Sequence, residues 1–113
     1  MATQIRHKDG VVIVEPHGKI VGHRVLELRI AILPEVKAYD VPRILINLEH
    51  TNRINSSGLG ILMQAHSIVT HKRGRIGVIH VSKHIKNLLV LSRLSSLFEH
   101  FDSEDAAVSA LST

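Results

Sequence analysis

The chain has 113 residues, a formal net charge of +4 with its nine histidines neutral, and a hydrophobic fraction of 44%. This length predicts a single domain over residues 1–113, and the apolar content suffices for a real core. Cysteine is absent, which excludes a disulfide framework and thiolate metal sites and favours the reducing cytoplasm. The N-terminus lacks a signal-peptide pattern, and no apolar run approaches the ~18 residues of a membrane span, so no membrane insertion is expected.

The basic charge is compatible with acidic partners, but we do not expect direct binding of nucleic acid. Lysines and arginines are scattered, and the only cluster is His71–Arg75. Nucleic-acid binders usually add stacking aromatic side chains to the charge, whereas this chain has only Tyr39, Phe98 and Phe101. The cluster also fits a helix end, with cations in its last turn and Gly74 just past it.

The chain is expected to open with a β-hairpin. Gln4–His7 is a short strand, Asp9-Gly10 is a hairpin turn, and the β-branched run Val11–Val14 is a second strand that stops at Pro16. Residues 17–22 form a connector.

A helix is predicted over His23–Lys37. Val25, Leu28, Ile32 and Val36 recur at helical spacing, with Leu33 alongside. Because proline inside a helix removes a hydrogen bond and clashes with the preceding turn, at a cost of ~3 kcal/mol, Pro34 predicts a kink or a break near Leu33.

Arg43–Leu48 is apolar almost throughout and predicts a strand that is buried on both faces. A polar loop leads from it to a helix at about Ser57–Lys72. The core face of that helix is expected to hold Ile61, Leu62, Ala65, Ile68 and Val69. Leu59, Met63, His66 and Thr70 fall on a second arc. Leu59 and Met63 are therefore expected to point away from the core, where either a neighbouring helix covers them or they contact a partner.

The C-terminal part predicts a strand at Arg75–Val81, a helix capped by Ser82 that runs to about Leu91, a short strand within Leu97–Phe101, and a last helix capped by Ser103. The buried residues of the two helices are predicted to be Ile85, Leu88 and Leu89, then Ala107, Val108 and Leu111. Strands that alternate with helices imply an α/β fold with a mainly parallel sheet.

The sequence does not predict an enzyme, a metal site or a cofactor. His80 and His84 straddle a strand end and a helix start, His66 and His71 point in different directions on a helix, and no His-Glu-x-x-His motif is present. Gly-x-Ser-x-Gly, a P-loop and a dinucleotide fingerprint are also absent.

Hydroxyl groups lie between the buried strand and its following helix, in Asn55-Ser56-Ser57-Gly58-Leu59-Gly60. Such a hydroxyl can cap the helix, which is the favoured interpretation of Ser57, or it can carry a phosphate that the helix N-terminus would help to hold. We interpret Asn55 as a cap or loop former. Gly58 and Gly60 are expected to allow close backbone approach.

This block resembles the STAS domain, most closely the bacterial anti-sigma factor antagonists. The resemblance rests on the strand Ile44–Leu48, the Asn55–Gly60 block, and Leu94-x-x-x-Phe98, and it extends over nearly the whole chain. It implies a STAS-like mixed sheet, with an N-terminal hairpin and helices packed on the sheet.

The resemblance also implies a function in a partner-switching pathway that controls a sigma factor. In that family, a serine kinase that is also the anti-sigma factor phosphorylates the residue equivalent to Ser56, and a phosphatase reverses the modification. By position, Asn55, Ser56, Ser57, Gly58, Leu59 and Met63 then form the partner-binding surface. A second copy of the chain is a further candidate partner.

The sequence departs from the family pattern in three places. Asn55 replaces the motif Asp, Val21 replaces a second Asp after the hairpin, and Arg93 replaces a glycine at a helix end. Two alternatives therefore stay open: a non-switching scaffold or accessory subunit of a signalling assembly or lipid transporter, and a small-ligand or nucleotide-binding module at the helix end.

Overall fold

A computed structural model describes residues 3–113; Met1 and Ala2, the first residues of the predicted domain, lie outside the described residues. The strands are β1 Thr3–Lys8, β2 Val11–Pro16, β3 Arg43–Asn47, β4 Arg75–Ile79 and β5 Glu99–Phe101. The helices are α1 His23–Ala38, α2 Ser56–His71, α3 Lys83–Leu91 and α4 Glu104–Leu111, with a 3₁₀ turn η1 at Ser95–Leu97. The predicted order of strands and helices is confirmed.

The five strands form one sheet in the order β1-β2-β3-β4-β5. β1 and β2 are antiparallel, and the other neighbouring pairs are parallel. The hairpin between β1 and β2 turns at Asp9 and Gly10, whose φ angles of 52° and 79° are those of the expected tight turn. The mixed, mainly parallel sheet agrees with the predicted fold class.

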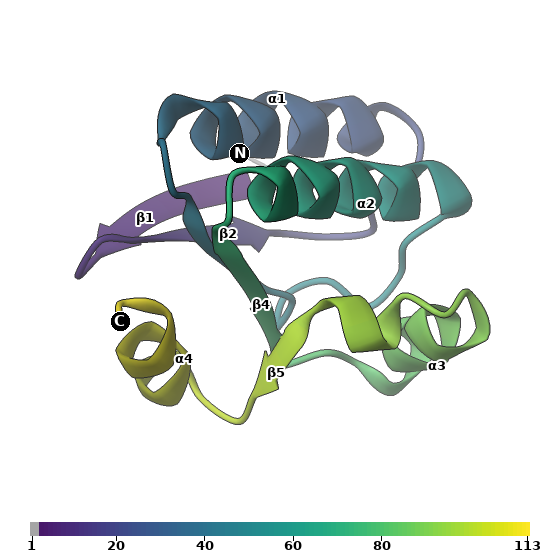
Figure 1. The fold of residues 1–113 in the computed structure, drawn as a ribbon. Helices are drawn as coiled ribbons and strands as arrows, with labels where there is room; N and C mark the ends of the chain where they lie inside the picture. Colours follow the sequence, from purple (N-terminus) through teal and green to yellow (C-terminus); the bar gives the residue numbers. More distant parts are fainter. Residues whose placement is uncertain (1–2) are drawn as a thin grey trace.

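Helices cover both faces of the sheet (Figure 1). α1 and α2 lie side by side on one face, and α4 lies on the other. Within β2, Val12 and Val14 join the larger hydrophobic cluster under α1 and α2, whereas Val11 and Ile13 join the smaller cluster under α4. Successive side chains of a strand point to opposite faces of the sheet. Because both faces of β2 are buried, its run Val11–Val14 is apolar at every position.

Of the kink or break expected near Leu33, the break is wrong, because helix α1 runs unbroken through Pro34. Pro34 itself is exposed, while Ile32, Leu33 and Val36 around it are buried. Each buried aliphatic side chain contributes about 1.5–3 kcal/mol, and together they outweigh the ~3 kcal/mol cost of an internal proline. Packing on the sheet therefore keeps the helix continuous.

The basic cluster at the end of α2 has a structural role. The Nζ atom of Lys72 donates hydrogen bonds to the backbone carbonyls of Lys37 and Tyr39, each at 2.8 Å, at the C-terminal end of α1. Arg73, with φ 60°, occupies the left-handed position just past the end of α2, where Gly74 was expected, and Gly74 is the next residue. Gly74 is needed for another reason, because a Cβ atom there would lie 2.1 Å from the carbonyl oxygen of Pro42.

The predicted caps of α3 and α4 are confirmed, and β5 lies within the predicted range Leu97–Phe101. Ser82 and Ser103 cap α3 and α4 by accepting hydrogen bonds from Ile85 and Ala106. Leu88 is only partly buried, whereas the other predicted core residues of the two helices are buried: Ile85, Leu89, Ala107, Val108 and Leu111.

Within residues 3–113, no helix combines the length and apolar character that a membrane crossing requires.

Candidate functional site

The loop before α2 is held by the connector between β2 and α1. The backbone N–H of Ile20 donates to the carbonyl of Arg53 at 2.9 Å, and the N–H of Asn55 donates to the carbonyl of Ile20 at 3.2 Å. Ile20 and Ile54 form an isolated parallel bridge, and both side chains are buried. Two aliphatic side chains thus fix where α2 begins.

Asn55 is the N-cap of α2. Its backbone is extended, with φ −93° and ψ 178°, and its Oδ1 atom accepts a hydrogen bond from the Gly58 N–H at 2.8 Å. The interpretation of Asn55 as a cap is confirmed, and the interpretation of Ser57 as the capping residue is wrong. Since an amide oxygen already occupies the capping position, Ser56 and Ser57 form the exposed first turn of the helix.

Gly58 is buried under the first turn of α2 and is required for close approach. A Cβ atom there would lie 2.6 Å from Cγ1 of Ile54 and 3.0 Å from Cγ2 of Ile20. By contrast, a Cβ atom at Gly60 would meet nothing within 4 Å, so the close approach expected there is wrong. The core beneath the first turn of α2 therefore sets the position of Gly58.

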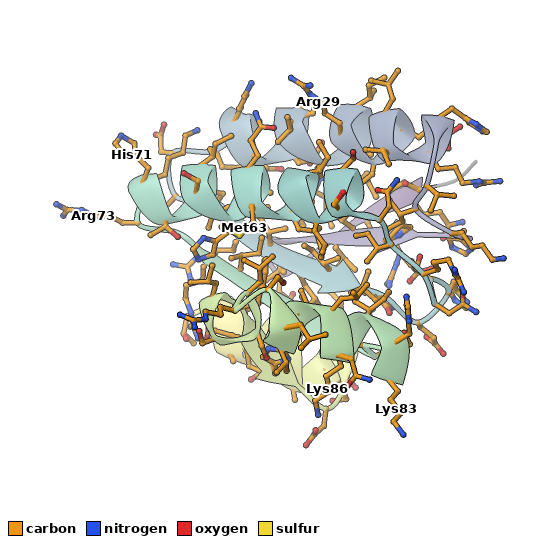
Figure 2. The ribbon with its side chains drawn as sticks, turned by 90° about the vertical axis from the view of Figure 1, so that its right-hand side faces the viewer. Arg29, Met63, His71, Arg73, Lys83 and Lys86 are labelled. Atoms are coloured by element: carbon orange, nitrogen blue, oxygen red, sulfur yellow. The ribbon has the colours of Figure 1, made fainter. Side chains whose placement is uncertain are left out.

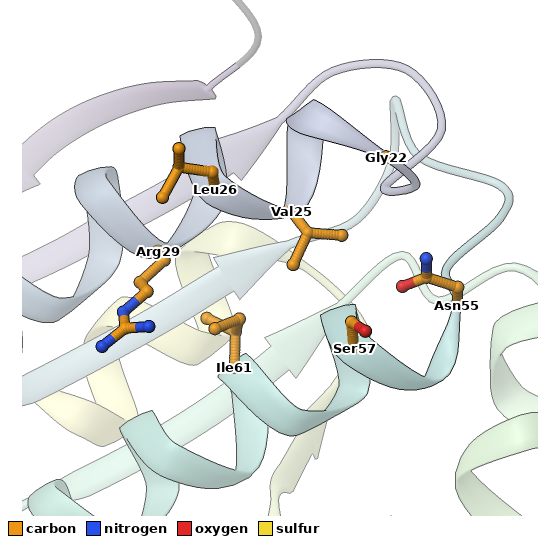
Figure 3. A pocket seen from close by; sticks show the side chains of 7 residues that line it. All are labelled: Gly22, Val25, Leu26, Arg29, Asn55, Ser57 and Ile61. Atoms are coloured by element: carbon orange, nitrogen blue, oxygen red, sulfur yellow. The ribbon is translucent and has the colours of Figure 1, made fainter.

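The two serines face different grooves. Ser57 lines an open groove of about 450 Å³ between α1 and α2. Figure 3 shows Ser57, Val25 and Ile61 facing one another across this groove, with Asn55 at one end and Arg29 at the other. Ser56 lines a second groove of about 360 Å³, which extends towards α3 and which we call the Ser56 groove; its walls are Val21, Arg53, Ile54, Asn55, Leu59, His84 and Leu88.

The side chains of Leu59 and Met63 are both half-buried. Leu59 packs against the main core cluster and shares the Ser56 groove with Leu88 of α3, so the expectation that it points away from the core is wrong. Met63 lines a separate groove with Leu97 and His66. Neighbouring elements therefore cover part of both side chains. Asn55, Ser56 and Leu59 line the same groove, whereas Met63 lines a different one.

Basic residues lie on the elements on either side of α2. The first turn of α2 carries no acidic residue. Arg53 and His84 line the Ser56 groove, and Arg29 lines the groove beside Ser57. Figure 2 shows Arg29 on α1 and Lys83 and Lys86 on α3 projecting outward on either side of α2. The charge of Arg53 and the positive end of the helix dipole favour an anionic group at the first turn of α2.

Sequence reasoning missed an apolar ridge on α1. Leu26 and Ile30 are 58% and 64% exposed, and Leu26 lines the groove beside Ser57. Their spacing of four residues, outside the stripe formed by Leu28, Ile32 and Val36, is the pattern that marks them. The surface beside Ser57 is thus more apolar than the loop sequence alone indicates.

Comparison with known proteins agrees with this fold. The model of the STAS domain matches residues 2–107. The chain belongs to the STAS domain family. This STAS domain is 25% identical, over 108 residues, to the anti-sigma F factor antagonist of Paenibacillus polymyxa; the match covers 96% of this chain and 92% of that protein.

Solved structures share the whole fold of this STAS domain. An anti-sigma factor antagonist (STAS) domain protein from Planctomyces limnophilus superposes with a TM-score of 0.89 at 16% identity, covering 98% of each chain. The Bacillus cell fate determinant SpoIIAA, solved in its phosphorylated form, superposes with a TM-score of 0.76 at 20% identity, covering 96% of this chain and 98% of that one. At these identities the likeness is one of fold.

Proposed function

We propose that this STAS domain is an anti-sigma factor antagonist whose binding to its partner is switched by reversible phosphorylation of Ser56. The observation that carries the proposal is the position of Ser56: it is the exposed first residue of α2, and the cap of that helix is Asn55. Its hydroxyl is therefore accessible to a kinase. A relative named as an anti-sigma F factor antagonist and a neighbour solved in a phosphorylated form support the same assignment.

The Ser56 groove suits a partner with acidic and apolar side chains. Arg53 and His84 supply cationic or polar groups, and Leu59 and Leu88 supply apolar contact area. A phosphate on Ser56 would add about −1.5 to −2 charges near pH 7. It would attract Arg53 and the free N–H groups of α2 and repel an acidic partner, which accounts for release without a large change of shape.

The proposed partners are an anti-sigma factor with serine kinase activity and a phosphatase, acting in the cytoplasm. Asn55, Ser56, Ser57 and Leu59 would form the centre of the contact. Met63 would contribute at its edge, and Gly58 would contribute by holding the first turn of α2 against Ile54.

A non-switching scaffold is the second candidate, and the side chain of Val21 favours it. Val21 lines the Ser56 groove where the family pattern has an acid, and it is 36% exposed. An apolar edge would suit a permanent contact better than a switched one, since obligate interfaces are more hydrophobic. This candidate predicts a complex that is indifferent to Ser56→Asp.

The deciding experiment is phosphopeptide mass spectrometry on the protein recovered from its native cells during growth and under stress. We expect phosphate on Ser56 in a fraction that changes with condition, loss of the modification in Ser56→Ala, and its retention in the matched variant Ser57→Ala. If the peptide is well covered and Ser56 is never modified, the switch is wrong and the scaffold becomes the better account.

A further inference from the structure

Three potential metal ligands gather where β2 ends, away from the switch serine. Glu15 is the penultimate residue of β2, His17 follows β2, and His50 lies in the loop after β3. Their donor atoms all lie within 4.8 Å of one another. Glu15 is only 8% exposed, whereas the two imidazoles are open to solvent. A buried carboxylate beside two accessible imidazoles is a donor set that a transition metal can use.

The two oxygens of the Glu15 carboxylate have different partners. Oε1 accepts hydrogen bonds from Nδ2 of Asn47 at 2.9 Å and from Nη2 of Arg6 at 3.3 Å. Oε2 lies 3.2 Å from Nε2 of His17 and 3.8 Å from Nε2 of His50. Asn47 and Arg6 thereby orient the carboxylate and leave Oε2 for the histidine side, which is the arrangement that supporting residues give to a metal-binding carboxylate.

The backbone holds the two histidine segments together. The N–H of Gly18 donates to the carbonyl of His50 at 2.9 Å. The hydroxyl of Thr51, which is 1% exposed, donates to the carbonyl of Pro16 at 3.0 Å. The imidazole rings of His17 and His50 stack with their centroids 4.6 Å apart and their planes 17° apart. The two histidine segments are therefore brought together before any ion binds, which lowers the ordering cost of binding.

We propose that Glu15, His17 and His50 form a binding site for a divalent transition-metal ion of the zinc class. Bonds of about 2.0–2.2 Å in a tetrahedral site place the donor atoms roughly 3.3–3.5 Å apart. The separations of 3.2 and 3.8 Å from Oε2 lie close to that range, and the two solvent-accessible rings must rotate out of their stack for both imidazole lone pairs to reach one ion. Water fills the remaining coordination position. Two nitrogen donors favour zinc, nickel, copper or cobalt over magnesium and calcium.

Binding of the ion displaces a proton where one lies between the donors. In the metal-free site, Nε2–H of His17 can donate to Oε2 of Glu15 across the 3.2 Å contact. The ion takes the place of that proton, the neutral ring carries its one proton on Nδ1 instead, and each donor contributes a lone pair with no net proton release from His17. No electron transfer and no further reactant are involved.

The test uses the untagged full chain, freed of metal with a chelator and titrated with ZnCl₂ by calorimetry. CoCl₂ is titrated in parallel, with the visible absorption of the bound ion as the readout. We expect one ion per chain, and a loss of affinity of at least about tenfold in His17→Ala, His50→Ala and Glu15→Gln, because even supporting residues are worth ten- to a hundredfold. Asn47→Ala tests the supporting contact, and circular dichroism checks that each variant is folded.

The matched control is His84→Ala, because His84 is exposed and lies outside the cluster. It should leave the affinity and the cobalt spectrum unchanged. The proposal is overturned if the wild-type chain shows neither heat nor a cobalt spectrum, or if binding survives in the folded double variant His17→Ala/His50→Ala. Loss of binding in His84→Ala alone would also overturn it, since the ion would then belong to other histidines.

Discussion

Oδ1 of Asn55 lies 2.8 Å from the backbone nitrogen of Gly58 and caps α2 without help from either serine. Capping of α2 is therefore a role of Asn55, and it is separate from any role of the two serine hydroxyl groups. Asn55 and Gly58 shape the loop, and the hydroxyl groups of Ser56 and Ser57 remain on the surface. Changes at these positions should therefore affect stability and regulation separately.

Removal of the cap should destabilise the domain. We expect Asn55→Ala to lower the free energy of unfolding by about 1 kcal/mol, because it leaves an N–H group of the first turn unpaired. Asn55→Asp should retain the cap and add about 0.3–1 kcal/mol, since a negative charge suits the helix N-terminus. Urea denaturation measures both, and Ser57→Ala is the control with an expected change within about 0.5 kcal/mol. A larger loss in Ser57→Ala than in Asn55→Ala would contradict the assignment.

The two glycines of α2 should respond in opposite directions to alanine. Gly58→Ala places a Cβ atom 2.6 Å from Ile54 and should destabilise the domain by about 1–3 kcal/mol. Gly60→Ala meets open space and should stabilise it by about 0.5–1 kcal/mol, because glycine costs conformational entropy inside a helix. Thermal or urea unfolding of the two variants gives the comparison. Equal effects would show that packing against Ile54 does not limit residue 58.

Arg93 occupies a strained backbone position after α3. Its φ of 61° is in the left-handed region, and the N–H of Leu94 bonds to the carbonyl of Leu89 at 2.8 Å to close the helix end. Left-handed conformations cost roughly 1–2 kcal/mol for residues other than glycine. Arg93→Gly should therefore stabilise the domain by about 1 kcal/mol, whereas Arg93→Ala should not. Urea midpoints of both variants test this, and stabilisation by alanine would point to the arginine side chain instead.

The ion pair between Glu99 and Arg75 should make stability fall in acid. Hydrogen bonds from Arg75 lower the pKa of the Glu99 carboxyl below its ordinary value of 4.5, with a smaller contribution from the charge of Arg75. A lowered folded-state pKa stabilises the protein above the ordinary value, and that stability is lost as the pH falls through the lowered one.

Glu99→Gln should therefore be less stable than wild type near neutral pH, by at most about 1 kcal/mol because both side chains are partly exposed to solvent. The difference should vanish as the pH falls below the range in which Glu99 titrates. Urea unfolding at a series of pH values measures it, with exposed Glu49→Gln as the control. A constant difference across that series would exclude titration of Glu99 as the cause.

The features that depend on residues close together along the chain could be predicted from the sequence. Strand and helix order, the hairpin turn, and the caps at Ser82 and Ser103 follow from local periodicity and from side chains that bond the nearest backbone groups. The block Asn55–Gly60 was placed at the start of a helix for the same reason. Most of the fold could thus be predicted, with element ends within about two residues.

The features that join distant segments depend on tertiary packing and could not be predicted from the sequence. Packing on the sheet keeps α1 continuous at Pro34, and α3 partly covers Leu59. The cluster of Glu15, His17 and His50 arises because β2 and β3 are parallel neighbours, which brings the residues after both strands to one edge. Histidine spacing along the chain could not predict it, since no local pattern encodes which strand ends will meet.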